Sequence, residues 1–99
     1  MLFREEQIDI TTSSGAGSAN TAKMRGMLSQ VRVIPTTTAT GEWTMAINDK
    51  NNRDILPLTT EVGVYNAQHS IPMDGIYTVA LSSTDKDEAF VILLNIQEG

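Results

Sequence analysis

The feature that most constrains the fold of this chain is an apolar run in residues 89–96 (AFVILLNI). Every second residue, at positions 90, 92, 94 and 96, is Phe, Ile or Leu, as expected for a β-strand with one buried face. Burying these four side chains contributes about 1.5–3 kcal/mol each. Val91 and Leu93 make the opposite face apolar as well. The pattern therefore predicts a central strand, or one that a partner covers.

The size and charge of the chain narrow the classes of function. Its 99 residues are enough for one β domain, predicted to span 1–99. The net charge is −5, and the seven basic residues are scattered, so we expect no nucleic-acid partner and no membrane partner. The chain contains no cysteine, so stability must come from packing or assembly. The first six residues lack the apolar core of a signal peptide, which predicts synthesis in a cytoplasm.

Alternating and turn-forming residues divide the chain into short strands. They predict an all-β fold, either an antiparallel β-sandwich or a small barrel of six or seven strands. The last two strands are expected to form a hairpin across the polar turn at 85–88. A helix over residues 22–28 is the alternative to the second strand. The strands are expected at 3–11, 21–34, 43–47, 55–58, 59–65, 76–82 and 89–96.

The strand faces can also be assigned from the sequence. In the first strand Ile8 and Ile10 point inward, while residues 6, 7 and 9 point mostly outward. The second strand is expected to bulge at Gly26, with odd positions from 27 to 33 on one face and even positions from 28 to 34 on the other. Pro35 ends this strand, and Pro57 places the fourth strand at a sheet edge.

Several polar segments are predicted as connections. Residues 13–20 are rich in glycine, serine and alanine, and they indicate a flexible loop. This loop is either a long hairpin connection or an arm that becomes ordered against a neighbouring subunit. It lacks the lysine and the following helix of a phosphate-binding loop. Residues 66–70 are expected to form a loop and residues 72–75 a turn, and residues 1–5 are a candidate N-terminal arm.

The single histidine does not define a catalytic site. His69 could pair with Ser70, Ser13 or Ser14, but adjacent residues rarely face each other productively, and no serine lies in a nucleophile-elbow pattern. Paired carboxylates at 5–6 and 87–88 lie in polar stretches, where nothing would separate their pKa values. We therefore predict no catalytic residues.

The acidic turn at residues 48–54 resembles a calcium loop only superficially. Asp49, Asn51 and Asp54 supply oxygen atoms, but Arg53 occupies the fifth loop position and glycine is absent at the sixth. The segment is predicted as a hairpin turn. We expect neither a metal nor another cofactor.

The surplus of apolar strand surface indicates a subunit that binds other chains. Trp43 is assigned to the core face that it shares with Met45 and Ile47. Alternatively, Trp43, Tyr65 and Tyr77 form an exposed face that stacks on sugars. The candidate interface residues are Met1, Leu2, Phe3, Gly15, Gly17, Met24, Met27, Val91 and Leu93.

Three segments in the first half of the chain resemble small virion structural proteins of tailed bacteriophages. They are 8–12 (IDITT) followed by the glycine-rich loop, 25–35 (RGMLSQVRVIP) and 42–47 (EWTMAI). The resemblance carries no catalytic residues across and implies an assembly role in the virion. The expected role is capsid decoration (cement), or else a neck, tail or fibre component. The implied partners are the major capsid protein or other virion proteins, and further copies of the chain in a trimer by analogy.

Two further functions are compatible with the sequence. One is a carbohydrate-binding adhesive module, which would use the aromatic residues named above. The other is a host-factor inhibitor that mimics nucleic-acid charge, although a net charge of −5 is modest for that purpose.

Overall fold

The chain folds into eight β-strands. The computed structural model describes residues 2–35, 42–51, 53–83 and 89–98, without the side chains of residues 2 and 57–60. The strands are β1 (Leu2–Thr11), β2 (Ala16–Asn20), β3 (Met24–Pro35), β4 (Trp43–Asn48), β5 (Asp54–Glu61), β6 (Tyr65–Gly75), β7 (Thr78–Ser83) and β8 (Ala89–Glu98). No helix occurs in this part of the chain, and so none that is long and apolar enough to cross a membrane.

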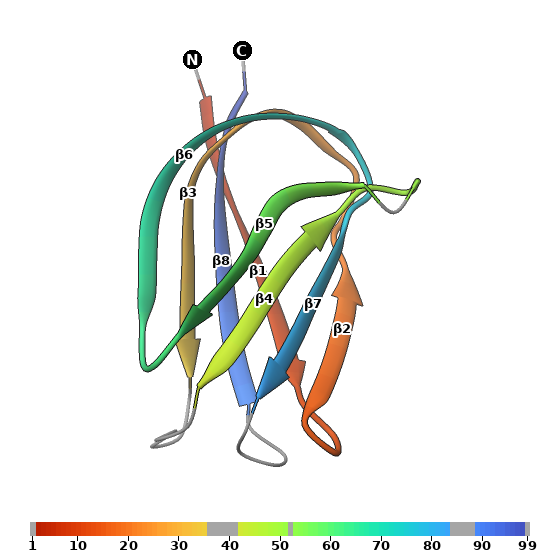
Figure 1. Ribbon diagram of the computed structural model, residues 1–99. Helices are drawn as coiled ribbons and strands as arrows, with labels where there is room; N and C mark the ends of the chain where they lie inside the picture. Colours follow the sequence, from red (N-terminus) through yellow and green to blue (C-terminus); the bar gives the residue numbers. More distant parts are fainter. Residues whose placement is uncertain (1, 36–41, 52, 84–88, 99) are drawn as a thin grey trace.

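The strands form two antiparallel sheets packed as a sandwich (Figure 1). Sheet A has the order β1-β8-β3-β6, and sheet B has the order β2-β7-β4-β5. Every connection except β4–β5 passes from one sheet to the other. This arrangement is that of an eight-stranded jelly roll. The predicted all-β sandwich is confirmed, with eight strands in place of six or seven.

The last strand lies in the middle of sheet A, as its two apolar faces predicted. β8 pairs with β1 on one side and with β3 on the other. The predicted hairpin between the last two strands is wrong, because β7 belongs to sheet B. β7 instead pairs with β2 and β4. The turn expected at 85–88 lies outside the described residues.

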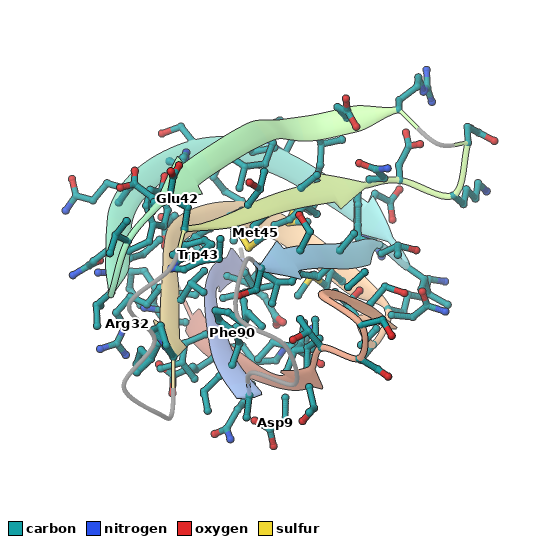
Figure 2. The ribbon with its side chains drawn as sticks, turned by 60° about the horizontal axis from the view of Figure 1, so that its bottom comes forward. Asp9, Arg32, Glu42, Trp43, Met45 and Phe90 are labelled. Carbon is teal, nitrogen blue, oxygen red and sulfur yellow. The ribbon has the colours of Figure 1, made fainter. Side chains whose placement is uncertain are left out.

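The core lies between the two sheets. Figure 2 shows Trp43 and Met45 of β4 facing Phe90 of β8. The Trp43 ring meets Phe90 edge-on at a centroid distance of 5.9 Å and Tyr65 at 6.3 Å. Its Nε1 donates a hydrogen bond to the Gly63 carbonyl oxygen at 2.8 Å, so the one polar atom of the indole is satisfied.

The alternative of an exposed aromatic face on this chain is wrong. Trp43 is 1% exposed and Tyr77 is 6% exposed. Tyr65 is half-buried against Trp43. These rings face inward because they alternate in phase with the buried apolar residues of their own segments.

A bulge changes the assignment of faces along β3. The register with both β6 and β8 shifts between Leu28 and Gln30, so the irregularity lies at Ser29 and not at Gly26. Leu28 is therefore fully buried, whereas Met27 points outward. The predicted faces are correct from Val31 onward and inverted before the bulge, because one extra residue reverses the side-chain alternation.

Gly26 has a different function in β3. Its φ is +140°, and an added Cβ would collide with the Gln97 carbonyl oxygen of β8. Glycine at this position therefore allows the backbones of β3 and β8 to approach closely.

The segment expected to be a flexible loop at 13–20 is mostly a strand. Ser14 and Gly15 form a two-residue turn with φ values of 55° and 88°. Ser13 and Ala16 exchange backbone hydrogen bonds of 2.8 and 3.2 Å across this turn. Both central residues have positive φ, as in a type I′ hairpin turn. β2 then pairs with β7, because small residues can form a strand when a neighbouring strand provides the backbone hydrogen-bond partners.

The polar middle of the chain forms a long edge strand. The loop expected at 66–70, the turn at 72–75 and the short strand at 59–65 are wrong, because β5 runs to Glu61 and β6 occupies Tyr65–Gly75. β6 is an edge strand that pairs with β3 on one side only. Its exposed positions alternate with half-buried ones and carry mostly polar side chains. The edge position expected for Pro57 is confirmed in β5. The alternative helix at 22–28 is wrong, because β3 begins at Met24.

Glu6 lies on a different face of its strand from the one that the sequence predicted. It alternates in phase with Ile8 and is half-buried on the inner side of β1, rather than directed outward. Its carboxylate lies 3.7 Å from the Arg4 guanidinium and accepts a hydrogen bond from the Ala22 backbone at 3.3 Å. These partners offset the cost of turning a charged group inward.

Candidate protein-binding surface

The outer face of sheet A carries side chains from four strands. β1 supplies a fully alternating set of exposed residues, and β8, β3 and β6 supply half-buried or exposed ones. We define this surface by its members: Phe3, Glu5, Gln7, Asp9, Met27, Gln30, Arg32, Ile34, Asn66, Gln68, Pro72, Val91, Leu93, Asn95 and Gln97. Asp9 and Arg32 can be followed in Figure 2 on the outer side of their strands.

One end of this surface is a row of mostly apolar side chains. The register places Phe3 beside Gln97, Gln97 beside Met27, and Met27 beside Pro72. Phe3 is 68% exposed and Met27 is 38% exposed. A large aromatic side chain and a flexible thioether are side chains that protein interfaces favour.

A second apolar group lies toward the opposite end of the same face. Val91 pairs with Ile34 in β3, and Leu93 lies one pleat away between Arg32 and Gln7. Val91, Leu93 and Ile34 are half-buried. Their remaining exposed area gives the middle strands of sheet A an apolar outer surface.

Hydrogen-bonded polar side chains separate the two apolar groups. The Asn95 amide nitrogen donates to Gln30 Oε1 at 2.9 Å, and Gln30 Nε2 donates to Asn66 Oδ1 at 2.8 Å. Arg32 forms an ion pair with Glu5 at 3.2 Å. All four strands of sheet A are therefore linked by side chains as well as by backbone, which limits the number of conformations on this face.

The structure brings together four of the nine predicted interface residues. Phe3, Met27, Val91 and Leu93 share the outer face of sheet A. Met24 is wrong as an interface residue, because it is fully buried in the core. Met1 and the Leu2 side chain lie outside the described residues.

The two predicted glycines lie elsewhere in the molecule. Gly15 is in the β1–β2 turn and Gly17 is in β2, at the edge of sheet B. A Cβ on Gly17 would lie 3.0 Å from Ile10 Cγ2, so this glycine serves the approach of β1 and β2. Ile34, Pro72 and the Asn95–Gln30–Asn66 chain of amides were not among the interface residues predicted from the sequence. Only the register between strands reveals that these residues are neighbours.

A polar hollow adjoins this surface at the β3 bulge. It has a volume of about 470 Å³ and is lined by Ser29, Gln30, Gln68, His69 and Ser70. His69 Nε2 lies 3.2 Å from the Tyr65 hydroxyl. Burial, with a smaller contribution from the charge of Glu61, raises the pKa of the Tyr65 hydroxyl above its ordinary value. The lining contains no carboxylate to orient a catalytic histidine, and its side chains are suited to hydrogen bonds with neutral polar groups.

The acidic turn at residues 49–53 uses its carboxylate for its own structure. Asp49 accepts hydrogen bonds from the backbone nitrogens of Asn51 and Arg53, both at 2.9 Å, and from Arg53 Nε at 3.1 Å. The backbone hydrogen bond from Arg53 is the main cause that lowers the pKa of Asp49. The predicted hairpin turn between β4 and β5 is confirmed. The described residues hold no group of three or more histidine or acidic side chains that could bind a metal.

These observations define a small jelly-roll domain with one large, ordered and partly apolar outer face. No protein-family model matches its sequence, and no curated protein is significantly similar to it.

Solved structures nevertheless share the fold. FLHE has a TM-score of 0.53 at 7% identity, with 99% of this chain and 100% of that chain covered. The C-terminal CBM6 of LamC from Zobellia galactanivorans has a TM-score of 0.52 at 8% identity, with 97% and 100% covered. The glucuronidase BtGH115A has a TM-score of 0.56 at 4% identity over 92% of this chain, which spans 14% of the enzyme. At these identities the likeness shows the fold alone.

Proposed function

We propose that this chain is a structural protein of a bacteriophage virion. In this proposal it decorates the capsid and binds neighbouring subunits through the outer face of sheet A. The observation that carries the proposal is the exposed row of Phe3 and Met27, which shares one ordered face with Val91 and Leu93. Viral capsid domains are among the proteins that use jelly rolls. The phage-like segments at the start of the chain support the same role.

The size of this face is suited to a specific contact. Four strands spaced about 4.8 Å apart, each about ten residues long, span roughly 600 Å². A standard interface buries about 800 Å² on each partner. The outer face of sheet A therefore provides most of one interface, with apolar groups beside hydrogen-bonded polar groups.

Two measurements test the virion role. We expect mass spectrometry of purified virions to detect the chain. We expect the purified protein to bind capsids assembled without it, and Leu93→Asp to weaken this binding more than tenfold by placing a charge in an apolar contact.

The matched control for Leu93→Asp is Ala80→Asp. It adds the same charge to the outer face of sheet B and should leave capsid binding unchanged. Absence of the chain from virions, or equal losses from the two variants, would contradict the proposal.

A carbohydrate-binding role is the second candidate. The observation in its favour is the polar hollow at the β3 bulge, which can exchange hydrogen bonds with sugar hydroxyls. The fold is shared with the LamC module, whose name describes carbohydrate binding. We expect a glycan array to show binding that Gln68→Ala abolishes and that Ser18→Ala, an exposed change on sheet B, preserves. An array without signal would exclude this candidate and leave the virion role unaffected.

A further inference from the structure

A second hollow lies at one end of the sandwich, and none of its lining residues belongs to the outer face of sheet A as defined above. It has a volume of about 550 Å³ and is formed where β2, β4 and β6 end and β3, β5 and β7 begin. Figure 1 shows these strand ends meeting on the right of the molecule. The lining residues are Asn20, Lys23, Lys50, Gly75, Ile76 and Thr78.

The connections around this hollow are held in place by hydrogen bonds. The Thr21 backbone nitrogen donates to the Tyr77 carbonyl oxygen at 2.8 Å, and the Tyr77 nitrogen donates to Thr21 Oγ1 at 3.0 Å. The Arg4 guanidinium donates to the Lys23 carbonyl oxygen at 3.3 Å. The Asp49 carboxylate organises the turn that carries Lys50. The backbone of the hollow is therefore preorganised.

The charge in this hollow has no counterpart in the described part of the chain. Lys23 and Lys50 are exposed, and neither has a carboxylate within 4 Å among the described residues. Arg4, Arg32 and Arg53 in contrast each have an acidic partner. Two ammonium groups thus share one concavity on a protein whose net charge is −5. An anion entering there meets two positive charges and reduces their mutual repulsion.

Two further groups refine the chemistry of the ligand. Thr78 Oγ1 donates to Asn20 Oδ1 at 2.9 Å, which leaves the Asn20 amide nitrogen available as a donor. Ile76 is 51% exposed beside the lysines. An inorganic anion would leave this side chain in water, whereas a peptide can place an apolar residue on it.

We propose that this hollow binds an acidic segment of another protein, with side-chain carboxylates at Lys23 and Lys50 and an apolar side chain against Ile76. The inference does not depend on the virion role, because none of the residues that line the hollow belongs to the outer face of sheet A as defined above. Together with that face, the hollow would give the chain a second binding surface.

The experiment is a titration of the ¹⁵N-labelled protein, followed by backbone amide shifts. The probe is a six-residue peptide of alternating glutamate and leucine, compared with the same peptide carrying glutamine for glutamate. We expect the acidic peptide to shift the amides of Lys23, Lys50 and Ile76 at about 20 mM salt, and binding to weaken at about 300 mM. Lys23→Gln and Lys50→Gln should each weaken binding about threefold to tenfold.

Ser82→Asp is the matched control, because it lowers the net charge equally at an exposed position near the other end of β7 from Thr78. It should leave the peptide affinity unchanged. Equal losses from Lys23→Gln, Lys50→Gln and Ser82→Asp, or equal shifts with the glutamine peptide, would overturn the proposal. Equal shifts with sulfate alone would also overturn it, because the hollow would then be a general anion site. Self-association of the protein that Lys23→Gln abolishes would identify the occupant as a second copy instead.

Discussion

Sheet A and sheet B differ in strand length and in the side chains of their outer faces. The strands of sheet A contain 10 to 12 residues, and those of sheet B contain 5 to 8. The outer face of sheet A carries Phe3, Arg32 and Leu93 among other large side chains. The described outer positions of β2, β4 and β7 in sheet B carry mainly small ones, including Ala16, Ser18, Thr44, Ala80 and Ser82.

This contrast distinguishes the inner-face residues that stabilise the fold from the outer-face residues that are available for binding. Both sheets bury an alternating apolar set on their inner faces, so the core alone accounts for the sandwich. Packing of the core does not determine which side chains occupy the outer faces. Sheet A carries large apolar side chains on its outer face, whereas the described outer positions of β2, β4 and β7 carry small ones. This difference is the reason that we propose sheet A as the face that meets a partner.

The largest expected effect comes from breaking the contact that joins the two sheets. Trp43→Ala removes a buried ring of sheet B from its contacts with Phe90 and Tyr65. We expect a loss of about 3–5 kcal/mol in the free energy of unfolding. Chemical denaturation measures it, and Trp43→Phe should recover part of the loss. If Trp43→Ala lowered the free energy of unfolding no more than a substitution at an exposed position does, the ring would not bridge the two sheets.

The next effect tests the close packing inside sheet A. Gly26→Ala places a methyl group against the Gln97 carbonyl oxygen, at a φ of +140°. We expect a loss of about 2–3 kcal/mol in the free energy of unfolding.

Gly63→Ala is the matched control for this change. It has a positive φ of +81°, but nothing lies within 4 Å of the added atom, so the loss should be about 1 kcal/mol. Similar losses from the two variants would show that backbone strain, and not the approach of β8, governs Gly26.

A smaller effect concerns the polar network on the outer face of sheet A. Arg32 and Glu5 lie 3.2 Å apart, with more than a third of each side chain exposed. A double-mutant cycle with Arg32→Gln and Glu5→Gln should give a coupling energy of about 0.2–1 kcal/mol, because solvent screens the pair. A coupling energy of zero would show that this pair does not help to order the face.

The smallest effect belongs to the turn between β4 and β5. The folded state lowers the pKa of Asp49, so its contribution to stability is present above the ordinary pKa and is lost as pH falls through the lowered value. Asp49→Asn should lower the denaturation midpoint at pH 7, and the difference from the unchanged protein should shrink below about pH 4. A difference that stays constant with pH would contradict a role for the carboxylate charge.

The strongest local patterns in the sequence were sufficient to predict the strands that form the core. The alternation at 90–96 predicted a buried central strand, and the alternation at 43–47 predicted the face on which Trp43 packs. The candidate surface was predicted in part, since Phe3, Met27, Val91 and Leu93 were identified as surplus apolar residues. Their common location required the pairing of β1, β8 and β3.

The failures occurred where neighbours outweigh local preference. β2 and β6 have the composition of loops, yet each forms a strand against one partner. Local alternation within a segment determined which residues of this protein are buried, because each strand must place its apolar side chains on one face. Strand partners, the bulge at Ser29 and the hollow between Lys23 and Lys50 depend on segments far apart in the chain. Their arrangement was decided by packing two sheets together, a long-range requirement that no single stretch of residues encodes.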